Sequence, residues 1–175
     1  MRLSPLVLAL GLAASSLSIA VNGQNPAVRP DDQVSSRSIV LLKAGEAAMA
    51  AGNYSSAEDQ FETALAVDPK NRAAFVAMAR NAQKQKLYGK AIKLTRKALA
   101  LEPTDRDALE VQGEAMVQLG ALPRAKENLA KLTQLCGATC PQVGQLSAAI
   151  ARGPAMAAAA ATPKTTPPTP VKKQN

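Results

Sequence analysis

The chain has 175 residues, a formal net charge of +8 and 47% hydrophobic residues, but only 2% of its residues are aromatic. An apolar content made mostly of Ala, Leu and Val suits close packing of helices, and suits a sheet or an aromatic-lined ligand pocket poorly. The chain contains no histidine, so it lacks the commonest general base and the commonest metal ligand, which argues against an enzyme or a metal protein.

The first 20 residues have the pattern of an export signal. Met1-Arg2 gives a short positive start, residues 3–20 carry no charge, and Ser18-Ile19-Ala20 is a small-x-small ending that a signal peptidase recognises. We expect residues 1–20 to be a signal peptide cleaved after Ala20, with Gly23 as the alternative site, and the mature protein to be periplasmic or secreted. An uncleaved membrane anchor is the alternative, disfavoured because the most apolar part, residues 6–12, is short. After cleavage the protein would not be an integral membrane protein.

A polar linker and two helices are predicted next. Residues 21–36 are polar and proline-containing, which predicts the linker. A helix is predicted from residue 36 or 37 to about residue 51, and after Gly52 a second one over Tyr54–Val67, which Asp68-Pro69 ends. The first helix is recognised by small and apolar residues at helical spacing: Leu41, Ala44, Gly45 and Ala48.

The same pattern returns at a fixed period. Pro103 follows Pro69 by 103 − 69 = 34 residues, and Ala91 follows Ala57 by 91 − 57 = 34 residues. A period of this length is typical of stacked repeats, in which each unit buries its apolar face only against its neighbours.

The period places the remaining elements. In the second unit it predicts helices over 73–85 and 88–101, with Asn71 as the first cap. The third unit begins with Thr104 as the predicted cap and Asp107 three residues on, an approximate capping box, and its second helix continues to residue 135. A last amphipathic helix over 141–151 would cap the stack. Residues 152–175, rich in Ala, Pro, Thr and Lys, are expected to be a disordered tail.

This pattern resembles the tetratricopeptide repeat (TPR) family, in the form of an exported bacterial TPR protein. The resemblance implies an all-α fold, a right-handed superhelical solenoid of three helix pairs at about 38–71, 72–105 and 106–139, followed by the capping helix. Together these form a domain over residues 37–151. The resemblance to the family is clearest in the first unit, at the motif positions Gly45, Tyr54, Ala57, Phe61, Ala64 and Pro69.

The resemblance also implies a binding surface. Proteins of this kind hold a peptide or a helix of a partner in the concave groove made by the first helix of each pair. Repeat proteins that bind the carboxyl end of a chaperone use Lys, Arg and Asn at set positions of this groove. Leu42 and Glu46 stand at the corresponding positions of the first unit, so this chain lacks that carboxylate-binding set. The expected ligand is an amphipathic helix or an extended segment with basic residues at its far end. By analogy the groove presents Leu42, Glu46, Met49, Val76, Arg80, Gln83, Lys84, Glu110, Glu114 and Val117.

Cys136 and Cys140 are the two cysteines of the chain. In an exported protein they are expected to form a disulfide that pins the capping helix to the last repeat. A redox dithiol or a metal site is the alternative. Zinc would need two further ligands that a histidine-free chain lacks, and no metal or other cofactor is expected.

A run of cations without an acid between them extends from Arg80 to Lys97 and is called the basic band below: Arg80, Lys84, Lys86, Lys90, Lys93, Arg96 and Lys97. It is either a solubilising surface or a contact for a phosphate-rich polymer or anionic lipid. Nucleic acid is not expected, because Tyr88 is the sole aromatic residue in the band.

The predicted function is therefore a non-catalytic adaptor with a protein partner. The alternative is a binder of an envelope polymer or an anionic membrane surface that uses the basic band. Glu110 and Glu114, one helical turn apart, could be cast as catalytic carboxylates, but the sequence offers no nucleophile with a base and no glycine-rich phosphate loop to accompany them.

Overall fold

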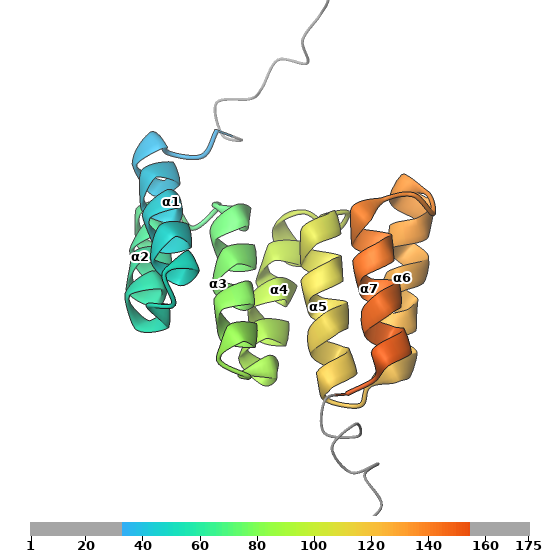
Figure 1. Cartoon of the computed structure of the whole chain (residues 1–175). Coiled ribbons are helices and arrows are strands. Elements are labelled where there is room, and N and C mark those ends of the chain that lie inside the picture. The colour runs from blue at the N-terminus through green and yellow to red at the C-terminus, as the bar shows by residue number, and fades with distance from the viewer. Residues whose placement is uncertain (1–32, 155–175) are drawn as a thin grey trace, which may run out of the picture. The chain divides into compact units, whose positions relative to one another are not determined.

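The computed structural model describes residues 33–154, so the predicted signal peptide, most of the linker and nearly all of the predicted tail lie outside the described residues. The fold below is that of the described part of the second of the chain's two units, which begins at Val34. Over the described residues it is all-α, with seven helices and no strand (Figure 1). In chain order these are α1 (Ser36–Ala50), α2 (Tyr54–Val67), α3 (Arg72–Lys84), α4 (Tyr88–Leu101), α5 (Arg106–Gln118), α6 (Leu122–Cys136) and α7 (Pro141–Arg152).

The helices form three pairs, α1 with α2, α3 with α4 and α5 with α6, and α7 packs against α5 and α6 at the end of the stack. The bounds of α2 and α4 are those that the sequence predicts, and α3 begins and ends one residue early. One predicted cap was wrong. Asp105, and not Thr104, caps α5, because the Asp105 carboxylate accepts from the backbone N–H of Ala108 at 2.8 Å. The predicted tail also begins one residue too early, since Arg152 ends α7.

The first pair is packed around a glycine and an aromatic ring. Gly45 lies so close to Phe61 that a methyl group added at Gly45 would sit 2.6 Å from the Phe61 Cδ1 atom. Phe61 is fully buried. Neither helix could bury this surface alone, and isolated helices of this length are marginal in water, so the pair is stabilised by this contact.

A buried polar network joins the first two repeats. The Asn71 amide donates to the Ser38 hydroxyl at 2.7 Å, and that hydroxyl donates to the backbone carbonyl of Ala64, also at 2.7 Å. The Asn71 carbonyl oxygen accepts from the Ala74 N–H and thereby caps α3. Asn71 and Ser38 are both buried, and their hydrogen bonds offset the desolvation of these polar groups.

A second buried network joins the last two repeats. Thr95 stands at the repeat position of Phe61 and is fully buried. Its hydroxyl donates to the Ala91 carbonyl and accepts from the Gln112 amide at 3.3 Å. Asn128 donates to Gln112 at 3.1 Å and to the Leu109 carbonyl at 3.1 Å. Polar side chains therefore fill the place that an aromatic ring fills in the first repeat.

No helix within residues 33–154 is long and apolar enough to cross a membrane.

Candidate functional site

The first helices of the pairs lie beside one another, because α1 contacts α3 and α3 contacts α5, and α7 continues the row beside α5. We call the surface lined by α1, α3, α5 and α7 the inner face. The ten predicted groove residues all lie on α1, α3 and α5.

The structure places these ten residues at different depths. Leu42, Val76, Glu110 and Val117 are buried, with Val117 at 0% exposure. This corrects the prediction that all ten are presented to a partner, since these four support the inner face from below. Glu46 and Lys84 are exposed. The other four are half-buried: Met49, Arg80, Gln83 and Glu114.

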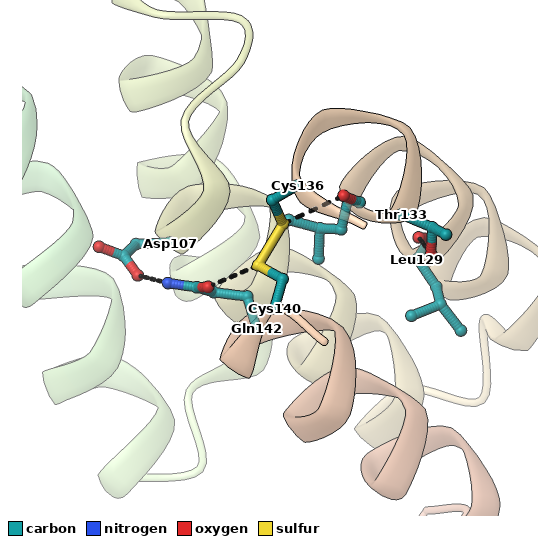
Figure 2. Close-up of a disulfide and its surroundings, with 7 residues drawn as sticks. Asp107, Leu129, Thr133, Cys136, Cys140 and Gln142 are labelled. Atoms are coloured by element: carbon teal, nitrogen blue, oxygen red, sulfur yellow. Dashed lines mark hydrogen bonds between the residues drawn. A yellow bond between two sulfur atoms is a disulfide. The ribbon is translucent and has the colours of Figure 1, made fainter. Parts of the chain in front are cut away.

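A polar chain crosses the inner face from α3 to α7. The Arg80 guanidinium lies 3.4 Å from the Glu110 carboxylate and 3.4 Å from the Asp107 carboxylate, both on α5. Asp107 in turn accepts a hydrogen bond at 3.0 Å from the Gln142 amide of α7 (Figure 2). Arg80 is thus already paired within the chain, which reduces its availability to a partner's carboxylate.

Burial sets the titration of the two groove glutamates. The pKa of Glu110 is raised to about 7, chiefly by desolvation; the Arg80 cation opposes this rise, and the nearby carboxylates of Glu114 and Asp107 add to it. Desolvation likewise raises the pKa of Glu114, against the lowering effect of the Arg80 and Arg152 cations.

The inner face is hollowed at one end. A recess of ≈ 340 Å³ lies between the last turns of α3, α5 and α7 and the start of α4. Three of its lining residues are among the ten predicted groove residues, and four are not; two of these four, Ala149 and Arg152, lie on α7, which was expected only to cap the stack. The lining residues are Gln83, Lys84, Tyr88, Glu114, Gln118, Ala149 and Arg152.

Gln83 holds the wall of this recess in place. Its amide donates to the backbone carbonyl of Val111 on α5 at 2.8 Å. Because a mid-helix carbonyl can accept a second hydrogen bond, this contact joins α3 and α5 without disturbing either helix.

Asp107, which pairs with Arg80, could have been found from the sequence, since it precedes Glu110 by one helical turn on the same side of α5.

The basic band does not form one surface. Arg80 faces the inner side and pairs with α5, and the Lys90 ammonium pairs with Glu58 on α2. Lys97 lies over the Phe75 ring, 5.6 Å from its centroid. Lys93, Arg96 and Lys97 are exposed on α4, while Lys84 and Lys86 lie at the turn between α3 and α4.

The structure joins Cys136, the last residue of α6, to Cys140, just before α7, with Cα atoms 5.7 Å apart (Figure 2). Beside the bridge, the Gln142 carbonyl oxygen lies 3.0 Å from the Cys140 sulfur. A disulfide sulfur has no proton to donate, so this is a polar contact only. Among residues 33–154 no group of three or more Cys, Asp or Glu side chains is placed to hold a metal ion.

No protein-family profile matches this chain, and no curated protein matches its sequence. Solved structures do. The Sgt2 TPR domain from Aspergillus fumigatus has a TM-score of 0.62 and 22% identity, over 81% of this chain and 92% of that chain. The described helices have the TPR fold.

Two further TPR domains share it. The first TPR of Spaghetti (RPAP3), bound to the HSP90 peptide SRMEEVD, matches with a TM-score of 0.61 and 23% identity, over 68% of this chain and 99% of that chain. The second TPR domain of human RPAP3, in complex with the HSP70 peptide SGPTIEEVD, matches with a TM-score of 0.59 and 24% identity, over 65% and 94%.

Proposed function

We propose that this protein is a non-catalytic adaptor that binds an extended or helical segment of a partner protein along its inner face. The observation that carries the proposal is the row of half-buried and exposed polar side chains on α1, α3, α5 and α7 around a recess, on a fold whose solved relatives are described as bound to peptides. Fold likeness alone does not identify the ligand, so the ligand's chemistry is argued from the residues.

Charges of both signs line the inner face, with the exposed cations Lys84 and Arg152 at the recess, and a basic ligand would pair with two carboxylates that are at least partly exposed. Glu46 is exposed and Glu114 is half-buried, whereas Arg80 is already held by Asp107 and Glu110. A partner segment with Lys or Arg near Glu114 gains a charge-assisted hydrogen bond. An acidic peptide such as SRMEEVD would meet Glu46 and Glu114 instead.

Peptide selection on the full chain tests this. A displayed random peptide library is selected on the immobilised protein, and fluorescence polarisation measures the affinity of each enriched peptide for the wild type and for Glu114→Lys. The matched control is Glu127→Lys, the same charge reversal at an exposed residue of α6. We expect enriched peptides to be basic, to lose roughly tenfold or more in affinity with Glu114→Lys and to keep it with Glu127→Lys.

Two results would reject the basic-ligand proposal. One is an affinity for SRMEEVD that equals that of the enriched peptides. The other is an equal loss of affinity with Glu114→Lys and Glu127→Lys, which would show attraction to net charge only.

We further propose that the protein acts after export, in the periplasm or outside the cell, and that the Cys136–Cys140 bridge forms there. Support comes from the charge and small-residue pattern of residues 1–20 and from the short separation of the two cysteines. Mass measurement of the mature chain purified from the exported fraction tests both points, since it gives the residue at the new amino terminus and the redox state of the cysteines.

The second candidate is a contact between the basic band and an anionic envelope polymer or membrane surface. Exposed Lys93, Arg96 and Lys97 on α4 favour it, although Arg80 and Lys90 are paired within the chain. A salt titration separates the candidates. Binding through the band should fall steeply between low and moderate salt, and peptide binding on the partly buried inner face should fall less.

A further inference from the structure

The turns inside the three helix pairs share one backbone feature. Gly52, Lys86 and Gly120, each 34 residues apart (86 − 52 and 120 − 86), have φ values of +79°, +61° and +74°. Within residues 33–154 Lys86 is the one non-glycine residue with positive φ. A lysine is less stable than glycine in this left-handed conformation, so its presence at this turn is not explained by folding. Strain of this kind is a reason to look for a function.

Two leucines project from the same turns. Leu87 follows Lys86 and is 45% exposed, and Leu119 precedes Gly120 and is 56% exposed. The first repeat has Asn53 and Ala51 at the corresponding positions. The fold therefore does not require a large apolar residue at either place.

These residues lie along one edge of the helical stack. The turn after α3, the turn after α5 and the end of α7 lie together at the lower edge in Figure 1. The recess confirms this closeness, because Lys84, Tyr88, Gln118 and Arg152 line it together. The exposed cations and leucines of this edge are called the turn edge: Lys84, Lys86, Leu87, Leu119 and Arg152. Glu114, which lines the recess together with Lys84 and Arg152, is half-buried.

We propose that the turn edge docks the protein on an anionic lipid bilayer. The cations would face the lipid phosphates, and Leu87 and Leu119 would enter the interfacial region. A soluble polyanion would satisfy the cations but leave both leucines in water, so the combination favours a bilayer. This surface borders the inner face, because Lys84 and Arg152 also line the recess, and it differs from the outer side of α4.

The test is co-sedimentation of the full chain with phosphatidylcholine vesicles, with and without phosphatidylglycerol. We expect binding to the anionic vesicles only. Lys86→Gly should weaken binding to the anionic vesicles about fivefold, because it removes one cation. The same substitution should raise the melting temperature, because glycine adopts the left-handed conformation without strain. Leu87→Ser with Leu119→Ser should weaken binding about tenfold. Lys131→Gln, which removes one charge from the exposed side of α6, outside both the turn edge and the basic band, is the matched control and should keep binding within about twofold.

Four results would each overturn the proposal. Equal binding to both vesicle types removes the role of anionic lipid. Wild-type binding by Lys86→Gly removes the role of the turn. A loss with Lys131→Gln as large as with Lys86→Gly reduces the effect to net charge. Unchanged binding by the double serine variant shows that neither leucine enters the bilayer.

Discussion

Gly113 of α5 lies directly beneath Leu146 of α7. A methyl group added at Gly113 would sit 2.6 Å from the Leu146 Cδ2 atom and 2.7 Å from its Cδ1 atom. Gly113 is the repeat equivalent of Gly45, and its nearest large neighbour comes from the capping helix and not from its own pair partner α6. Leu146 thus has the role in the last repeat that Phe61 has in the first, and α7 completes that repeat.

This contact predicts a coupled effect on stability. Gly113→Ala should lower the free energy of unfolding by roughly 1–3 kcal/mol through overpacking, and Leu146→Ala by about 2–5 kcal/mol through a cavity. The double variant should lose clearly less than the sum, because the alanine methyl enters the space that the leucine vacates. Urea denaturation of the four proteins measures this, and strictly additive losses would show that the two residues do not touch.

The buried Asn71 amide predicts a difference between two substitutions. Asn71→Ala should lower the free energy of unfolding by roughly 2–4 kcal/mol, because it removes the α3 cap and one partner of the buried Ser38 hydroxyl. Asn71→Thr keeps an oxygen that can cap α3 but is too short to reach Ser38, so it should lose less. Thermal denaturation compares them. Equal losses would mean that the cap contributes nothing.

The raised pKa of Glu110 predicts that the free energy of unfolding falls as the pH rises. Its pKa is about 7 in the folded chain against a usual value of 4.5, so the folded state binds more protons than the unfolded state between those values. Its contribution is fully present below about pH 4.5 and is lost as the pH rises through about 7. Glu114, whose pKa is also raised, acts in the same direction.

Urea denaturation at pH 5 and pH 8 checks this prediction. Glu110→Gln should reduce the loss of stability between the two pH values, because the glutamine cannot ionise. Glu127→Gln on the exposed side of α6 is the control and should behave as the wild type. The role of Glu110 would be contradicted if the wild type gained stability between pH 5 and pH 8, or if it lost as little stability as Glu110→Gln.

The disulfide predicts a modest and local stabilisation. Closing so short a loop gives about 2 kcal/mol in the chain-entropy model. Replacing both cysteines with serine should lower the melting temperature, and reducing agent should lower that of the wild type alone. Binding of the selected peptides should not change. If removing the disulfide also abolished peptide binding, the role of these cysteines would extend beyond fixing α7.

Much of the fold follows from local signals in the sequence. Asp68-Pro69 ends α2 and Gly52 turns the chain, and both effects depend on neighbouring residues only. The contacts that the sequence did not reveal join distant residues. Thr95 is hydrogen-bonded to Gln112, and Gly113 packs against Leu146. Neither pair recurs at a fixed spacing in the sequence from which the contact could be predicted. The same limit applies to the inner face, where the depth of Val117 and Glu110 depends on the packing of neighbouring helices and not on their periodicity.

Peptide binding on the inner face is tested most directly by mapping a selected peptide on the full chain by nuclear magnetic resonance. We predict that the amide and side-chain signals that shift on titration belong to the inner face, above all Arg80, Gln83 and Glu114, while those of Lys93 on α4 and Glu127 on α6 remain unchanged. Shifts that gather on α4 and α6, with the inner face unaffected, would contradict it.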